Sequence, residues 1–256
     1  MFIKLDNFIF NGDYKAEHIK MYILLLLNKP TFSNNISTNI ELLNELYGLK
    51  DIKKNISKII GILSYLNEME IITINKPLEN IKKKDKIKII INELNYDDFM
   101  GFTKIEKDDL DLTKDFTTNE FVLYFFMKRY YNKSYGKAFF SYRFINECIG
   151  MNNKTAKNII DMFCIMGIIQ KHNPNYYTKD ITGAIRRTNN EYRNFTNTPK
   201  PYKTLIKFDD VDKDTYTKLK NSRLYNEVQH NCYLGFGENR KVKDTFKFLI
   251  PRTNVS

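Results

Sequence analysis

The sequence predicts an α+β fold in which two similar domains precede a C-terminal extension, and three observations favour this fold class. The chain has 256 residues, which is enough for two small domains. A heptapeptide recurs after about 100 residues, as Leu43–Leu49 and then Ile145–Met151. Each copy follows an unusually apolar segment and precedes an amphipathic segment that runs into an Ile-rich stretch. Self-similarity of this kind indicates repeated structural units.

In the first repeat, the residue pattern predicts three helices and two strands after a short extended lead at residues 2–10. The first helix is apolar almost all round, which marks it as central, and Pro30 disfavours helix at the residue before it. The second helix ends at Gly48, a residue suited to the left-handed conformation at a helix C-terminus. The third carries apolar residues at spacings of three and four. The expected helices cover 16–28, 39–47 and 52–66, and the expected strands cover 71–74 and 87–91.

The second repeat opens with Thr117 and Glu120 at the spacing of a capping box, in which each residue bonds the backbone of the other. Acidic, aperiodic residues 95–115 precede it and are interpreted as a linker or an interdomain turn. The expected helices cover 121–131, 141–149 and 154–166, and the expected strands cover 168–172 and 202–208. The two strands would enclose a loop of some thirty residues, and loops of that length are usually functional or disordered.

Helix, short helix, turn, long helix and strand is the outline of a winged helix, a helix-turn-helix variant with a loop, or wing, between paired strands. The sequence therefore predicts tandem winged-helix domains with a C-terminal α/β extension. The expected boundaries are 1–94 for the first domain, 95–115 for the linker, 116–208 for the second domain and 209–256 for an extension of unknown role. Within that extension we expect a helix at 214–229 and strands near 231–236 and 246–250.

The chain is basic, with 41 Lys and Arg against 30 Asp and Glu and a net charge of +11. Residues 171–256 carry 17 basic and 9 acidic side chains, so the excess lies mostly in the last third. This balance favours a polyanionic partner. Heavy use of Asn, Ile and Lys, with no Trp, is also what an AT-rich genome produces. That explanation weakens any interpretation of the lysines as selected for binding.

The residue pattern argues against secretion and against membrane insertion. The N-terminus has no long hydrophobic region, and the longest apolar runs, 21–27 and 121–127, are far shorter than the ~20 residues that span a bilayer. We therefore expect a soluble, cytoplasmic protein. The three cysteines, Cys148, Cys164 and Cys232, have no paired spacing, which argues against a disulfide framework. Cys148 and Cys164 fall on apolar faces of expected helices, so a packing role is expected for these two.

The motifs of catalytic and cofactor sites are missing from the sequence. No glycine-rich phosphate loop occurs, and the three histidines are scattered without metal-ligand spacing. Asp210, Asp212 and Asp214 alternate like a calcium loop, but the required Gly and Glu positions hold Thr215 and Asn221. We therefore expect no cofactor, no metal and no enzymatic activity. A DNA-nicking enzyme that uses a tyrosine stays open as an alternative.

The candidate DNA-binding residues lie on the third helix of each repeat and in the wings. In a helix-turn-helix, the second helix lies in the major groove with its N-terminal residues at the base edges. Asparagine suits adenine and lysine suits guanine there, although any amphipathic helix also shows such residues to solvent. The candidates in the first repeat are Lys50, Lys53, Lys54, Asn55, Lys58, Lys82, Lys83, Lys84 and Lys86. Those in the second are Asn152, Asn153, Lys154, Thr155, Lys157, Asn158, Arg186, Arg187 and Arg193.

Two parts of the chain resemble a known family. Residues 2–10 with 22–30, and residues 152–160 through 167–169, resemble the winged helices of plasmid replication initiators and phage replisome organisers of low-GC Gram-positive bacteria. The resemblance covers about residues 1–172 and implies binding of repeated origin sites by tandem winged helices. The long second wing and the C-terminal extension depart from that pattern.

The first hypothesis is therefore a sequence-specific double-stranded DNA-binding protein, a plasmid or phage replication initiator. A transcriptional regulator or conjugation accessory protein of the same fold is the alternative. A third hypothesis makes one winged helix a protein-interaction module. Double-stranded DNA is the expected partner, a homodimer and replication proteins are further candidates, and no membrane is expected.

Overall fold

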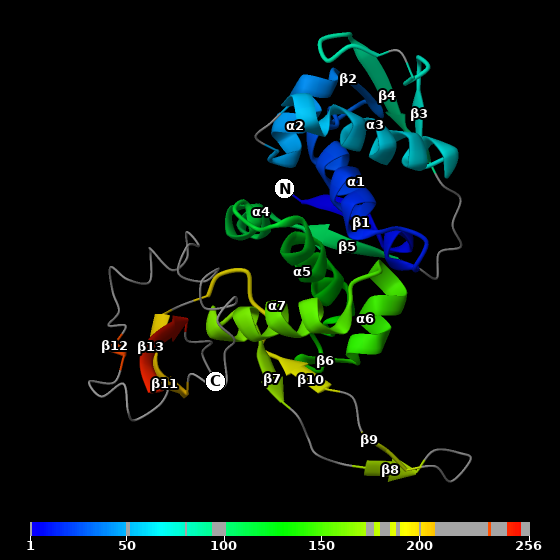
Figure 1. Cartoon of the computed structure of the whole chain (residues 1–256). Coiled ribbons are helices and arrows are strands. Elements are labelled where there is room, and N and C mark those ends of the chain that lie inside the picture. The colour runs from blue at the N-terminus through cyan, green and yellow to red at the C-terminus, as the bar shows by residue number, and fades with distance from the viewer. Residues whose placement is uncertain are drawn as a thin grey trace. The chain divides into compact units, whose positions relative to one another are not determined.

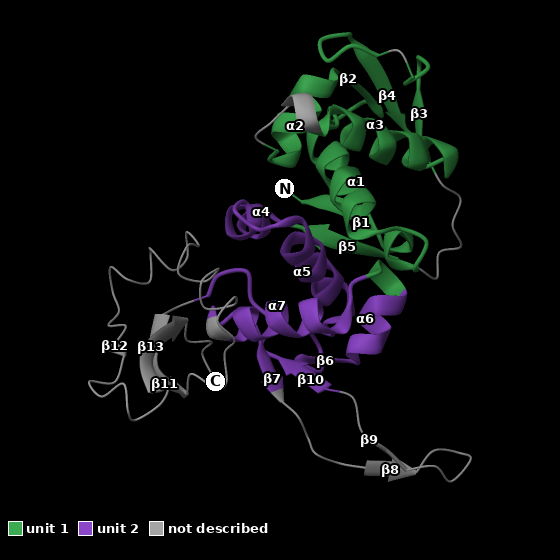
Figure 2. Cartoon of the chain, viewed as in Figure 1, with its two compact units in different colours: residues 1–105, 148–150 green, residues 106–147, 151–256 purple. Residues whose placement is uncertain are grey.

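The computed structural model describes residues 2–49, 52–79, 81–93, 101–172, 177–179, 185–187, 190–199, 201–207, 235–236 and 245–251. For residues 52–54, 165, 172, 177–179, 185–187, 201–207, 235–236 and 245–251 it describes the backbone alone. Within these ranges the chain combines helices with small antiparallel sheets (Figure 1). The α+β class predicted from the sequence is therefore confirmed. The chain forms two compact units, residues 1–105 with 148–150 and residues 106–147 with 151–256 (Figure 2).

Unit 1 is built around a helix with two further helices and a three-stranded sheet. Its elements are β1 (Ile3–Asp6), the 3₁₀ turn η1 (Asn7–Phe10), α1 (Ala16–Asn28), β2 (Asn35–Thr38), α2 (Ile40–Tyr47), α3 (Ile52–Glu68), β3 (Ile72–Ile74), β4 (Ile87–Ile91) and β5 (Phe102–Ile105). β1 and β5 form a separate antiparallel pair, with Ile3 opposite Ile105. Eight residues of α1 are buried, as its nearly continuous apolar sequence predicts.

In the three-stranded sheet of unit 1, β4 lies between β2 and β3. Side chains alternate between the two faces of a strand. Ile87, Ile89 and Ile91 of β4 are buried, whereas Lys88 is exposed. On β2, Ile36 is buried and Ser37 is exposed. The sheet therefore has one face in the core and one outer face that is polar and open.

Unit 2 contains a second run of the same kind. Its elements are α4 (Lys107–Thr113), α5 (Thr118–Tyr130), β6 (Lys137–Phe140), α6 (Tyr142–Ile149), α7 (Asn153–Ile165), β7 (Gln170–His172), β8 (Tyr177–Lys179), β9 (Ile185–Arg187), β10 (Asn190–Arg193), β11 (Pro201–Lys207), β12 (Gly235–Phe236) and β13 (Thr245–Pro251). β8 pairs with β9, and β13 lies between β11 and β12 in a separate sheet. The predicted capping box begins α5: Glu120 accepts from the Thr117 amide at 2.8 Å.

The core of unit 2 is aromatic where that of unit 1 is mostly aliphatic. The Phe140 ring stacks on Tyr192 at 4.3 Å between centroids and meets Phe126 edge-on at 5.5 Å. All residues of α5 from Glu120 to Met127 are buried. Aromatic pairs in these geometries add to the stabilisation from buried area.

The two units repeat one topology. In each unit, a short strand follows the central helix, and two helices follow that strand. Two further strands then complete the three-stranded sheet. In unit 1 the sheet order is β2-β4-β3, and in unit 2 it is β6-β10-β7, so the last strand is central in both. All these pairs are antiparallel. The corresponding helices also match in length: α1 and α5 have 13 residues each, and α2 and α6 have 8 residues each.

Sequence analysis located the six helices of the repeats to within a few residues but missed β2 and β6. Neither Asn35–Thr38 nor Lys137–Phe140 is a run of β-branched residues, and each strand is only four residues long. Their strand conformation depends on pairing with β4 and β10, which lie some fifty residues further along the chain. Residues 8–10, expected to be extended, form the buried turn η1 instead.

The interpretation of residues 95–115 as a linker is wrong for residues 101–115. β5 pairs with β1 in unit 1, and α4 belongs to unit 2, so the units divide after Ile105. Acidic residues suggested an exposed connection, but Asp109 is fully buried. Residues 95–100 lie outside the described residues, as does the helix expected at 214–229.

The expected partner of β7 is also wrong. β7 pairs with β10 rather than with residues 202–208, and β11 pairs with β13 instead. The loop of the second repeat therefore spans residues 173–189, about half the expected length, and encloses the β8-β9 pair. The alternating aromatic and β-branched residues at 202–208 were the stronger strand signal, but the Asn190–Arg193 segment supplies Tyr192, whose ring completes the core.

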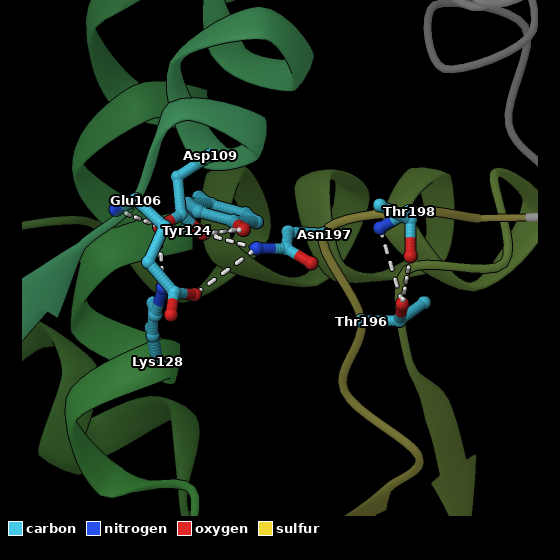
Figure 3. A network of polar contacts seen from close by, with 7 residues as sticks. All are labelled: Glu106, Asp109, Tyr124, Lys128, Thr196, Asn197 and Thr198. Atoms are coloured by element: carbon cyan, nitrogen blue, oxygen red, sulfur yellow. Dashed lines mark hydrogen bonds and ion pairs between the residues drawn. The ribbon is translucent and has the colours of Figure 1, made fainter. Parts of the chain in front are cut away.

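A buried polar network fastens α4 and the chain after β10 to α5 (Figure 3). Lys128 of α5 is ion-paired with Asp109 of α4 and, at 3.3 Å, with Glu106. The Tyr124 hydroxyl donates to Asp109 at 2.6 Å. Asn197 donates to both carboxylates, at 3.3 Å to Asp109 and at 3.4 Å to Glu106. Asp109, which is fully buried, thus has several donors, as a buried charge requires, whereas 45% of the Glu106 side chain is accessible.

Tyr124 acts as a donor in this network at neutral pH. Burial raises the pKa of its hydroxyl well above the usual value, and the charge of Asp109 raises it further. Because the members of the network bond one another, we assign it a structural role.

Glu70 and Gly167 occupy the same place at the ends of the third helices. The Ile71 amide donates to Leu66 in unit 1, and the Ile168 amide donates to Phe163 in unit 2. The residue before each donor is left-handed, with φ of 55° at Glu70 and 72° at Gly167. A glycine adopts this conformation without strain, whereas other residues do not.

Glu70→Gly should stabilise unit 1 by up to about 1 kcal/mol, because relief of left-handed strain outweighs the added chain entropy. Gly167→Ala should destabilise unit 2 by about 1–2 kcal/mol for the converse reason. Native-state hydrogen exchange, read by mass spectrometry on peptides of α3 and α7, assigns each change to its unit. Slower exchange in Gly167→Ala would contradict this account.

Lys128→Met should destabilise unit 2 by about 3–5 kcal/mol, since it leaves two carboxylates without their cation. The matched control is Arg143→Met, which breaks the exposed pair with Glu147, whose side chains are 86% and 53% accessible. We expect the control to cost below about 1 kcal/mol. Urea unfolding followed by circular dichroism compares the two. Equal losses would show that the buried network contributes no more than a surface pair.

Candidate nucleic-acid interface

The repeated heptapeptide forms the end of the second helix and the start of the turn that leads to the third helix of each repeat. The Asn44 side-chain amide donates to the Leu49 carbonyl at 2.8 Å, and the Asn146 amide donates to the Met151 carbonyl at 3.1 Å. Gly48 and Gly150 are left-handed, with φ of 83° and 66°. The same contacts at equivalent places therefore set the direction in which each third helix leaves the turn.

The first turn of α7 presents polar side chains to solvent. Asn152, Asn153, Lys154 and Lys157 are exposed, while Thr155 is half-buried. Asn152 also caps the helix, since its Oδ1 accepts from the Thr155 amide at 2.8 Å. Two-point pairing of Asn152 with adenine would therefore need its oxygen to leave the cap. Asn158 is half-buried on the same helix.

Asp161 holds two lysines at this surface. Its carboxylate lies 2.8 Å from the Lys157 ammonium and 3.4 Å from that of Lys171 on β7. Asp161 is mostly shielded, with 17% of its side chain accessible, whereas 55% of Lys157 is accessible. A phosphate that approached Lys157 would therefore compete with Asp161. Sequence analysis missed Asp161, although its spacing of four from Lys157 on a helix was a usable signal.

Beneath this surface, two side chains of unit 2 are kept in their neutral forms. Burial raises the pKa of the Cys164 thiol to about 12, and burial also raises the pKa of the Tyr192 hydroxyl. Cys148 is buried too. Packing is thus the role that fits both cysteines in the described part of the chain.

The third helix of unit 1 is longer than its counterpart, with 17 residues against 13. Counted back from the shared bonds at Leu66 and Phe163, Ile56 aligns with Asn153, so α3 has one extra turn at its start. Lys53 and Lys54 lie in that turn. The exposed residues Ser57 and Lys58 align with Lys154 and Thr155.

The two surfaces predicted to match therefore do not match residue by residue. Asn55 is half-buried, and the Lys58 ammonium lies 5.6 Å from the Tyr47 ring centroid. Lys50 and the side chains of Lys53 and Lys54 lie outside the described residues. The sequence spacing, with five more residues between Gly48 and Ile72 than between Gly150 and Ile169, predicts a longer connection or a longer third helix in the first repeat, and the longer helix is what the structure shows.

The lysine-rich loop of unit 1 is fixed beside α2. Lys82, Lys83, Lys84 and Lys86 are all exposed. The Lys83 carbonyl accepts from the Glu41 amide at 3.0 Å, and Asp85 accepts from the Lys82 amide at 3.0 Å. This loop joins β3 to β4, as predicted, and shows four cations at one edge of the unit.

The arginines assigned to the second wing are divided between two elements. Arg186 and Arg187 lie on β9, opposite Thr178 and Tyr177 of β8, and their side chains are outside the described residues. Arg193 lies on β10 within the main sheet, not in the loop, and is ion-paired with Glu191. Its assignment to the wing followed from the wrong strand partner and is corrected.

The residues that the structure describes offer no metal centre and no membrane span. Among them, no cluster of three or more His, Cys, Asp or Glu could hold a metal ion. None of their helices is long and apolar enough to cross a membrane.

Comparison with known proteins adds no family assignment. No protein-family model matches the chain, and no curated protein is significantly similar to it.

Proposed function

We propose that this chain is a sequence-specific double-stranded DNA-binding protein with one winged helix in each unit. The observation that carries the proposal is the shared topology: helix, strand, helix, turn, helix and two strands, with the last strand central. The turn is closed by the same asparagine bond in both units. In a winged helix, this arrangement directs the third helix to the major groove.

The unit-2 surface supports the proposal most strongly. At the start of α7, Asn153, Lys154 and Lys157 are exposed next to one another, which is where a recognition helix meets base edges. Unit 1 would add phosphate contacts through its lysine-rich loop. Such contacts position a protein on the duplex without reading sequence.

The proposed role within this class is initiation of plasmid or phage replication, in the cytoplasm and without catalysis. It rests on the resemblance of residues 2–30 and 152–169 to replication initiators. Transcriptional regulation or conjugation accessory binding is the alternative for the same fold.

Replacement of Lys154 and Lys157 by glutamate should abolish duplex binding, since it puts two repelling charges where α7 would enter the groove. The matched control reverses Lys107 and Lys114, which are exposed on or beside α4 of the same unit. Fluorescence anisotropy with a duplex selected from random DNA measures both. If both double variants bind duplex as the wild type does, unit 2 does not recognise DNA. A protein-interaction module is then the better interpretation of unit 2.

DNase footprinting with the selected sequence should protect tandem repeats if the chain is a replication initiator. A regulator would instead protect a palindrome at a promoter, because a two-fold symmetric dimer reads a symmetric site. A covalent adduct with supercoiled plasmid would point to tyrosine-dependent cleavage and contradict a non-catalytic role.

A further inference from the structure

A pocket of about 260 Å³ opens at the outer face of the unit-1 sheet, and nothing in the proposed helix-turn-helix contact uses it. Its wall comes from β2, from β4, from the residue after β3 and from the end of the lysine-rich loop. The lining residues are Asn35, Ser37, Asn75, Lys86, Ile87 and Lys88.

Strand register brings these side chains together. Ser37 of β2 lies opposite Lys88 of β4. On the other side of β4, the backbone amide of Lys88 donates to the side-chain oxygen Oδ1 of Asn75 at 2.7 Å. The backbone amide of Asn75 donates to the Lys88 carbonyl at 3.2 Å. Ser37, Lys88 and Asn75 therefore form a row across the sheet. Asn35 lies two residues before Ser37, and Lys86 lies two residues before Lys88. Both are therefore on the same face as that row.

The polar side chains in this pocket are suited to an anion. Lys86 and Lys88 are exposed cations, Ser37 has a hydroxyl, and Asn35 has an amide. Because Asn75 uses its oxygen to accept from Lys88, its amide nitrogen is the end that can donate to a ligand. None of the six lining residues is acidic.

The equivalent place in unit 2 has the opposite chemistry. There, Phe139 of β6 lies opposite Glu191 of β10, where unit 1 has Ser37 and Lys88. Glu191 pairs with Lys137 at 3.7 Å and with Arg193. One topology thus carries a cationic, donor-lined face in unit 1 and a charge-compensated face with an exposed aromatic ring in unit 2.

We propose that this pocket binds a phosphate group, held by Lys86, Lys88, Ser37 and the Asn75 amide. The phosphate comes either from a DNA backbone or from a free phosphate-bearing small molecule. The first source rests on the proposed function and would extend the interface across the outer face of unit 1. The second does not depend on DNA binding.

Titration of inorganic phosphate into the ¹⁵N-labelled full chain, at ionic strength held constant with chloride, tests the pocket itself. The amide signals of Ser37, Asn75 and Lys88 should shift and saturate. Lys88→Glu, which installs the unit-2 residue type, should abolish the shifts, and Lys86→Gln with Lys88→Gln serves if the first variant does not fold. Lys76→Glu is the control, because Lys76 is exposed in the same loop but does not line the pocket.

Duplex binding by single glutamine variants of Lys88 and Lys76 separates the two sources. If a DNA phosphate occupies the pocket, Lys88→Gln should reduce the magnitude of the slope of log affinity against log salt by about 1. Lys76→Gln should leave the slope unchanged, and inorganic phosphate should compete with duplex. If phosphate shifts the signals but duplex neither shifts them nor competes, the ligand is a free phosphate compound. A wild-type chain that binds no duplex but keeps the phosphate shifts would overturn the proposed function and not the pocket. The proposed phosphate site would be overturned if phosphate shifted none of the signals and the Lys88→Gln and Lys76→Gln variants bound duplex equally well.

Discussion

Asn44 and Asn146 each donate a side-chain hydrogen bond to the backbone carbonyl five residues later, across a left-handed glycine. This bond fixes how the chain reverses between the second and third helices of each unit. Asn44 is fully buried, and a buried side-chain amide without this bond would be costly; Asn146 makes the same bond from an exposed position. The direction of the third helix, the return of the strands and the side chains left exposed at the helix start all depend on this turn.

The two units then put one topology to different uses. Unit 1 has a mostly aliphatic core, an extra turn on α3 and an outer sheet face with exposed lysines. Unit 2 has an aromatic core and a buried network that joins α4, α5 and the chain after β10. The lysines of the lysine-rich loop and Lys88 on β4 are exposed in unit 1. In unit 2, several cations are ion-paired with Asp161 or Glu191. A duplicated fold therefore offers two surfaces with different electrostatics, which suits contact with different parts of a polyanion.

Much of the framework could be predicted because it depends on local signals. The capping box at Thr117 and Glu120, the left-handed Gly48 and the apolar helix at 16–28 each follow from neighbouring residues. Strand pairing could not be predicted in the same way. The segment at 202–208 has the stronger strand composition, yet β10 pairs with β7 because Tyr192 fills the core beside Phe140. β2 and β6 have no strong strand composition, since their conformation depends on distant partners.

The candidate sites divide along the same line. From the sequence alone come the repeat, the α+β class, the six helices and the polar start of α7, because helix periodicity and capping act over a few residues. Only the tertiary structure decided that Asp161 restrains Lys157, that Arg193 belongs to the sheet, and that Asp109 is buried. It also decided that Ser37, Asn75 and Lys88 meet in one row. These contacts join residues that are distant in the sequence or carry charges whose partners no local pattern identifies, so they exist only once the strands are in register and the helices are packed.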